Sequence, residues 1–181
     1  MKILTLIIIS SFICLSCKSP EARIPVTKNT GTFIKESAQR NKKLNEKEHE
    51  IIKKLIEATN DSSFLVSDKG FYYAYKNKTE ITNYTPQFGD IVNFNYNIKD
   101  LNGTLIYSED ELKTQNYAMD QQELFTGLRE GLQLMKAGET VTFIFPSQKA
   151  FGYYGDENKI GMNTPLICEV TINSITKKET N

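Results

Sequence analysis

Residues 91–98 alternate apolar and polar side chains with a period of two. Val92, Phe94, Tyr96 and Ile98 fall on one side of this pattern, and three asparagines fall on the other. Because successive side chains of a β-strand point to opposite faces, the pattern predicts a strand that buries one face in a core.

Asn102-Gly103 predicts a tight hairpin turn directly after this strand, because both residues tolerate the positive φ angles that such a turn needs. Residues 105–107 are then the partner strand. Asp68-Lys69-Gly70 is predicted to form a second turn, which divides an earlier β-rich segment in two. The further strand segments are predicted at residues 64–75, 141–145 and 166–175.

One amphipathic helix is predicted among the strands, within residues 123–135. Leu124, Leu128, Leu132 and Met135 recur there at steps of three and four residues. Gly138 is suited to a left-handed cap after it. The sum is an α+β fold, with a mostly antiparallel sheet and one central short helix.

Residues 1–16 have the features of a bacterial lipoprotein signal peptide. Lys2 precedes an apolar run at residues 3–15, which is shorter than the roughly 20 residues of a membrane span and fits a signal-peptide core. Ser16-Cys17 resembles the cleavage site at which the cysteine becomes the lipidated first residue, although Cys14 stands where leucine is usual. We expect lipidation at Cys17 and a chain anchored in the cell envelope, at the periplasmic face of a bacterial membrane or at the outer membrane.

Two alternatives to lipidation stay open: a simple signal peptide cleaved elsewhere, and an uncleaved membrane anchor. With Cys14 removed and Cys17 acylated, Cys168 is the remaining cysteine, so no intramolecular disulfide is expected.

Residues 17–32 contain two prolines and no apolar period, and we expect a flexible tether there.

Residues 33–84 are expected to hold an N-terminal helix, up to about residue 59, and the strands that lead into the domain. The helix has a second possible start at Asn45, which with Glu48 has the spacing of a capping box. Its apolar stripe, which includes Ile51 to Ile56, is expected to dock on the domain, with self-association as the alternative.

Composition excludes several function classes. The chain has 22 basic and 22 acidic residues, whereas a nucleic-acid binder normally carries a basic excess. One histidine and three cysteines leave little material for a zinc site, and His49 is assigned no function. Asp156-Glu157-Asn158 lacks the spaced oxygen ligands of a calcium site and is interpreted as a polar loop tip. We therefore expect no metal and no nucleic-acid partner.

Residues 85–177 resemble the FKBP-type peptidyl-prolyl cis-trans isomerase domain, in segment order and nearly in spacing. Among lipoproteins, the whole layout is similar to the gliding-motility-associated FKBP-type lipoproteins of Bacteroidota. The segments that carry the resemblance are residues 89–96, 102–106, 123–135, 138 and 150–155.

The resemblance implies a twisted antiparallel sheet wrapped around one short helix, with the substrate prolyl ring in an apolar pocket between them. It implies no cofactor. Rotation about an X-Pro bond is slow because amide resonance must be lost, a barrier of about 20 kcal/mol. An apolar pocket with one or two hydrogen-bond donors can favour the twisted state without a covalent step.

The resemblance also implies site residues. Tyr96 matches an aromatic wall, and Phe151 matches a loop tyrosine without its hydroxyl. Leu124 and Phe125 match the pair before the helix, where the second backbone N–H meets a substrate carbonyl. Ile160 matches an apolar loop residue. Tyr96, Phe125 and Phe151 are the expected catalytic residues.

Four further pocket positions depart from the family pattern. Ile106 replaces an aromatic residue, Tyr107 replaces an aspartate, Leu128 replaces a tryptophan and Cys168 replaces a phenylalanine. Replacing tryptophan by leucine removes contact worth about 1 kcal/mol, so weak or selective catalysis is expected.

Two functions therefore compete. The first is a membrane-tethered isomerase that assists the folding of exported proteins and acts on Pro-containing segments of exported or envelope proteins. The alternative is a catalytically weak FKBP-like chaperone, or a scaffold lipoprotein of a cell-envelope complex for gliding motility.

Overall fold

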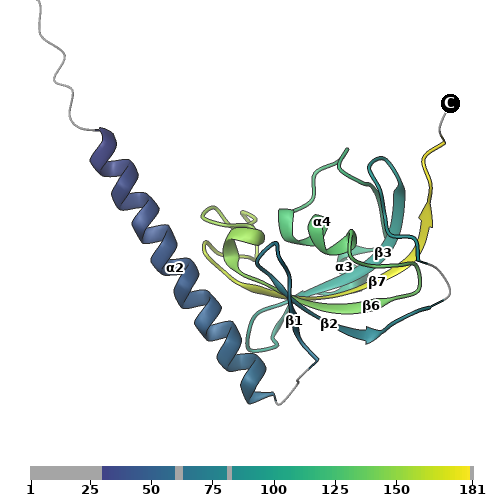
Figure 1. Ribbon diagram of the computed structural model, residues 1–181, viewed down its shortest axis with the longest axis horizontal. Helices are drawn as coiled ribbons and strands as arrows, with labels where there is room; N and C mark the ends of the chain where they lie inside the picture. Colours follow the sequence, from purple (N-terminus) through teal and green to yellow (C-terminus); the bar gives the residue numbers. More distant parts are fainter. Residues whose placement is uncertain (1–29, 60–62, 81–82, 180–181) are drawn as a thin grey trace, which may run out of the picture. The chain divides into compact units, whose positions relative to one another are not determined.

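The structure is a computed structural model that describes residues 30–59, 63–80 and 83–179 (Figure 1). By its internal contacts the chain divides into two compact units, Met1–Ser37 and Ala38–Asn181. The second unit contains most of one long helix and all of the sheet. The predicted signal peptide and Cys17 lie outside the described residues.

Helix α2 is continuous from Thr30 to Ala58. It starts three residues before the predicted position, so residues 30–32 of the expected tether are helical. The alternative start at Asn45 is wrong, because the run of helix-forming residues continues through it. Glu48 therefore forms no capping box and is free to reach a distant part of the chain.

All paired strands of the sheet are antiparallel, as predicted. The order is β1-β2-β6-β7-β3-β4, with β5 also paired to β3. The strands are β1 Leu65–Val66, β2 Tyr72–Asn77, β3 Ile91–Lys99, β4 Leu105–Tyr107, β5 Gln115–Ala118, β6 Thr140–Phe145 and β7 Leu166–Thr176.

Three short elements were not predicted from the sequence, namely helix α3, Glu109–Leu112, strand β5 and the 3-10 helix η1, Ser147–Lys149. They are three or four residues long, which is too short for a periodic signal. A local signal for α3 does exist: Ser108 caps it by accepting the N–H of Glu111, and acidic residues fill its first turn.

Helix α4, Thr126–Leu132, lies across the face of β3, β7 and β6 (Figure 1). A Cβ atom at Gly127 would lie 2.5 Å from the ring of Phe145, and one at Gly131 would lie 3.0 Å from Phe143. Glycine at this four-residue spacing therefore allows the helix backbone to approach the sheet directly.

Helix α4 is shorter than the segment predicted at residues 123–135, because the backbone of Phe125 is extended and sets the helix start. Gly138 has the predicted positive φ of 85°, but it does not cap the helix. It lies in a later turn, and its N–H donates to the carbonyl of Ile172 at 2.7 Å.

The alternation of β3 separates two faces of the sheet. Val92, Phe94, Tyr96 and Ile98 join the main core with the buried residues of α4, whereas the asparagines face outward. On the outer face Ile52 of α2 packs against Tyr72 and Ile144. The helix stripe thus docks on its own domain, as we expected.

Candidate active site

A cavity of about 550 Å³ lies beside the N-terminus of α4. Four of the nine residues that the sequence placed in the site line it, namely Tyr96, Leu124, Phe125 and Phe151. They come from β3, from the extended segment before α4 and from the loop after β6. Three chain segments that are distant in sequence therefore form one aromatic wall.

Tyr96 is 9% exposed and lies on the inner face of β3. Burial raises its pKa to about 12, with smaller contributions from Cys168 and Tyr107. The phenol therefore stays protonated at neutral pH. A protonated hydroxyl in an apolar cavity is a hydrogen-bond donor for a carbonyl oxygen.

The rings of Phe125 and Phe151 lie 5.1 Å apart, and Phe125 makes an edge contact with the core ring of Phe145 at 5.5 Å. Phe125 is also the N-cap of α4. Its backbone N–H has no hydrogen-bond partner among the described residues. Phe125 thus combines an apolar ring with an available backbone donor, the pair of features that the resemblance implies.

Polar residues complete the lining: Gln122, Glu123 and Arg129. None of these three residues was predicted from the sequence to belong to the site. Arg129 stands four residues after Phe125, so the i, i+4 spacing along α4 is a signal that was available. Its side chain lies 3.5 Å from Asp120.

The other predicted pocket residues do not line this cavity. Leu128, Ile160 and Cys168 are buried in the main core, and burial raises the pKa of the Cys168 thiol. Ile106 and Tyr107 pack against the edge of that core. A contact between these five residues and substrate stays a prediction.

Phe151 belongs to a segment that we call the cavity loop, residues 147–164. The loop begins with the short helix η1, Ser147–Lys149. Lys149 forms an ion pair with Glu130 of α4 at 2.7 Å. Gly152 has a positive φ of 60°, and its N–H donates to the carbonyl of Ser147 at 2.8 Å.

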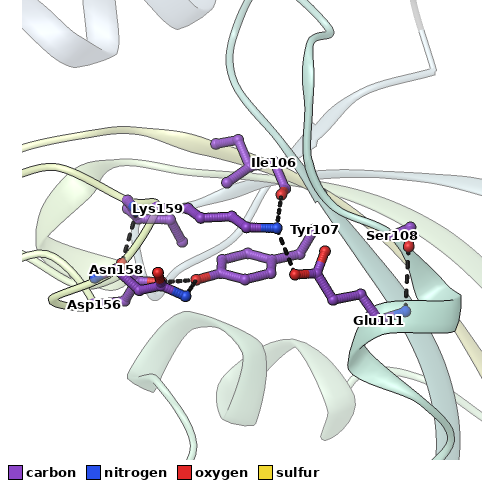
Figure 2. A network of polar contacts seen from close by, with 8 residues as sticks. Ile106, Tyr107, Ser108, Glu111, Asp156, Asn158 and Lys159 are labelled. Carbon is purple, nitrogen blue, oxygen red and sulfur yellow. Dashed lines mark hydrogen bonds and ion pairs between the residues drawn. The ribbon is translucent and has the colours of Figure 1, made fainter.

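The tip of the cavity loop contacts β4 and α3 through polar groups (Figure 2). Tyr107 donates its hydroxyl hydrogen to Asp156 and accepts from the Asn158 amide at 3.0 Å. Lys159 pairs with Glu111, and its Nζ lies 4.6 Å from the centre of the Tyr107 ring.

Tyr107 replaces the aspartate of the family pattern, but the region still contains a carboxylate, because Asp156 of the cavity loop contacts Tyr107. Burial opposes ionisation of Asp156, but hydrogen bonds from Tyr107 and from the N–H groups of Ile160 and Asn158 lower its pKa. The hydrogen bond to Asp156 in turn raises the pKa of Tyr107. The residues interpreted as a polar loop tip thus form a specific network.

Within the described ranges, no cluster of three or more histidine, cysteine or acidic side chains has the arrangement of a metal site. Over the same residues, no helix has both the length and the apolar character to cross a membrane.

A family model for the FKBP-type peptidyl-prolyl cis-trans isomerases matches residues 82–173, just over half of the chain. The chain belongs to this family. Its reaction class is the rotation of peptide bonds that precede proline. The matched range contains the whole cavity and leaves helix α2 outside.

Solved structures support the fold of this FKBP-type isomerase. FkpA from Escherichia coli is 19% identical, with a TM-score of 0.60 over 97% of this chain and 82% of its own. A peptidyl-prolyl cis-trans isomerase from Pseudomonas syringae pv. tomato str. DC3000 is 18% identical, with a TM-score of 0.59 over 73% of this chain and 96% of its own. The search of curated proteins returned no match.

Proposed function

We propose that this FKBP-type isomerase is tethered to a membrane of the cell envelope and assists the folding of exported proteins. The observation that carries the catalytic part is the aromatic wall of Tyr96, Phe125 and Phe151 around one cavity. The observation that carries the tether is the apolar run at residues 3–15, followed by Ser16-Cys17.

The proposed chemistry requires no covalent step. The prolyl ring occupies the cavity between Tyr96 and the Phe125–Phe151 pair, where water is removed from the imide. The N–H of Phe125 donates to a substrate carbonyl and fixes the chain across the cavity. A twisted amide has lost resonance, so the charge separation between its oxygen and its nitrogen is smaller than in the planar form. An apolar wall therefore favours the twisted form over the planar one.

The test of catalysis is the refolding of a protein whose slow phase is limited by a non-native X-Pro bond. This protein, added at a substoichiometric concentration relative to the refolding protein, should accelerate that phase. Phe151→Ala should reduce the acceleration by about tenfold, since loss of an apolar wall removes contact with the reacting group. Tyr154→Ala is the matched control, because Tyr154 is on the same loop and 82% exposed.

The test of the tether is membrane fractionation. Cys17→Ala should move the protein from the membrane fraction to the soluble fraction, because acyl chains give stable anchoring only when attached. Retention of the variant in the membrane fraction would instead favour the uncleaved-anchor alternative.

A second candidate function is a chaperone or scaffold with little turnover, including a scaffold role in a gliding-motility complex. Ile106, Tyr107, Leu128 and Cys168 favour it, because they replace the residues usual in the family pocket. This function predicts that the folded chain binds unfolded proteins without accelerating the slow phase. It also predicts that a Tyr107→Asp variant gains turnover.

A further inference from the structure

Glu48 on helix α2 is almost completely buried, with 4% of its surface exposed. Its Oε2 accepts the backbone N–H of Ser147 at 2.7 Å, and its Oε1 accepts the Ser147 hydroxyl at 2.7 Å. Ser147 is 3% exposed. Because so little of either residue is exposed, Ser147 is the main hydrogen-bond donor within reach of both carboxylate oxygens.

Ser147 connects this contact to the cavity wall. Its carbonyl accepts the N–H of Ala150 at 3.0 Å and that of Gly152 at 2.8 Å. These are the two residues on either side of Phe151. The backbone that sets the direction of the Phe151 side chain is therefore hydrogen-bonded to the residue that Glu48 holds.

Other buried carboxylates serve different segments. Asp90 accepts from Tyr84, from Gln87 and from the N–H of Lys178. Glu139 accepts from the N–H groups of Thr79 and Lys136. Neither contacts the cavity loop. Of the three buried acidic residues in the described part of the chain, Glu48 alone lies in the segment before the family-matched range.

We propose that Glu48 is a positioning residue for Phe151, so that the helix preceding the isomerase domain sets the width of the prolyl cavity. The inference rests on the proposed function, in that Phe151 contacts the substrate proline. Glu48 does not line the prolyl cavity, and it acts on Phe151 through Ser147. Loss of Glu48 releases the start of the loop and lets Phe151 move away from Phe125.

The experiment compares Glu48→Ala with Glu50→Ala in the full-length chain, using a short peptide with one Leu-Pro bond as substrate. Glu50 is exposed and two residues away on the same helix, which makes it a matched control. Glu48→Ala should raise KM by about three- to tenfold and change kcat less, because a displaced wall weakens substrate binding in both states. Glu50→Ala should change neither constant.

A conservative variant separates positioning from simple helix docking. Glu48→Gln keeps an oxygen for the Ser147 N–H, and its amide NH₂ can donate to the Ser147 hydroxyl oxygen. It should return KM to near the wild-type value. Should Glu48→Ala fail to fold, Ser147→Ala gives a milder change: it retains the backbone bond to Glu48 and should raise KM by a smaller factor.

The position of Phe151 is also measured directly, from its ring signals in ¹³C-phenylalanine-labelled protein, assigned with a Phe151→Leu variant. Glu48→Ala should shift these signals and leave those of the core residue Phe71 in place. Unchanged Phe151 signals and unchanged KM in folded Glu48→Ala protein would overturn the proposal. If the wild-type chain does not act on the peptide, the proposed function fails, and the ring signals still decide the role of Glu48.

Discussion

The cavity loop is attached at two places that differ in almost every physical property. At its base, Ser147 donates two hydrogen bonds to the carboxylate of Glu48, and both residues are buried. We call this the base attachment. At its tip, Tyr107 binds Asp156 and Asn158, and Lys159 pairs with Glu111. We call this the tip attachment; the Lys159 and Glu111 side chains in it are 42% and 44% exposed.

From this contrast we expect that the burial of a polar contact, rather than the number of such contacts, decides how firmly the loop is held. Water competes for every group of an exposed contact, so its net contribution is small. A buried donor that loses its partner finds no water, and the full desolvation cost appears. We therefore expect the base attachment to dominate, although the tip attachment contains more residues. Four predictions test this order.

The largest expected effect is on the base. Glu48→Ala should lower the free energy of unfolding by about 3 kcal/mol, because it leaves the Ser147 N–H and hydroxyl without acceptors. Urea denaturation measures it, and Glu50→Ala is expected to stay within about 0.5 kcal/mol of the wild type. A loss no larger than that of the control would show that water replaces Glu48 at no cost.

Removal of the Tyr107 hydroxyl should have a moderate effect. Tyr107→Phe retains the ring against the core and loses the hydrogen bonds to Asp156 and Asn158, at a cost of about 1 kcal/mol. The same urea experiment measures it, with Tyr154→Phe as a control for an exposed hydroxyl. If Tyr107→Phe costs as much as Glu48→Ala, the contrast between the two attachments is wrong.

The tip attachment should also be sensitive to acid. The folded-state pKa of Asp156 is lowered from 3.8, so its interactions contribute stability above about pH 4 and are lost as pH falls through the folded-state value. The amide signal of Ile160, whose N–H donates to Asp156 at 2.7 Å, should report this titration by NMR. Asp156→Asn should abolish the pH response; an unchanged response would assign it to another group.

The smallest effect is expected at Lys159. Its ion pair with Glu111 is largely exposed, so Lys159→Gln should change the free energy of unfolding by less than about 0.5 kcal/mol. Urea denaturation at low and high salt provides the measurement. A loss above 1 kcal/mol that disappears in high salt would show that the charge network holds the loop tip.

The part of the site on a regular element was predictable from the residue pattern, and the part on loops was predictable from resemblance to the family. The alternation around Tyr96 predicted the strand and its buried face, and the residues before α4 were placed by their resemblance to the family. Arg129 was missed although its helical spacing from Phe125 was visible. Asp156 was missed for a different reason: its partner Tyr107 is 49 residues away, and no local pattern indicates that pairing.

Apolar repeats along the chain were enough to predict most of the strands, including the one that holds Tyr96, and the helix stripe that docks through Ile52. Phe125 and Phe151 follow no such repeat and were placed by their resemblance to the family. Periodicity involves residues that are close in the chain, so it can be recognised in the linear sequence. The sequence suggested a local capping role for Glu48. That its carboxyl group instead accepts hydrogen bonds from Ser147, 99 residues away, became visible only in the tertiary structure, because a buried polar group takes its hydrogen-bond donors from whatever the fold brings beside it.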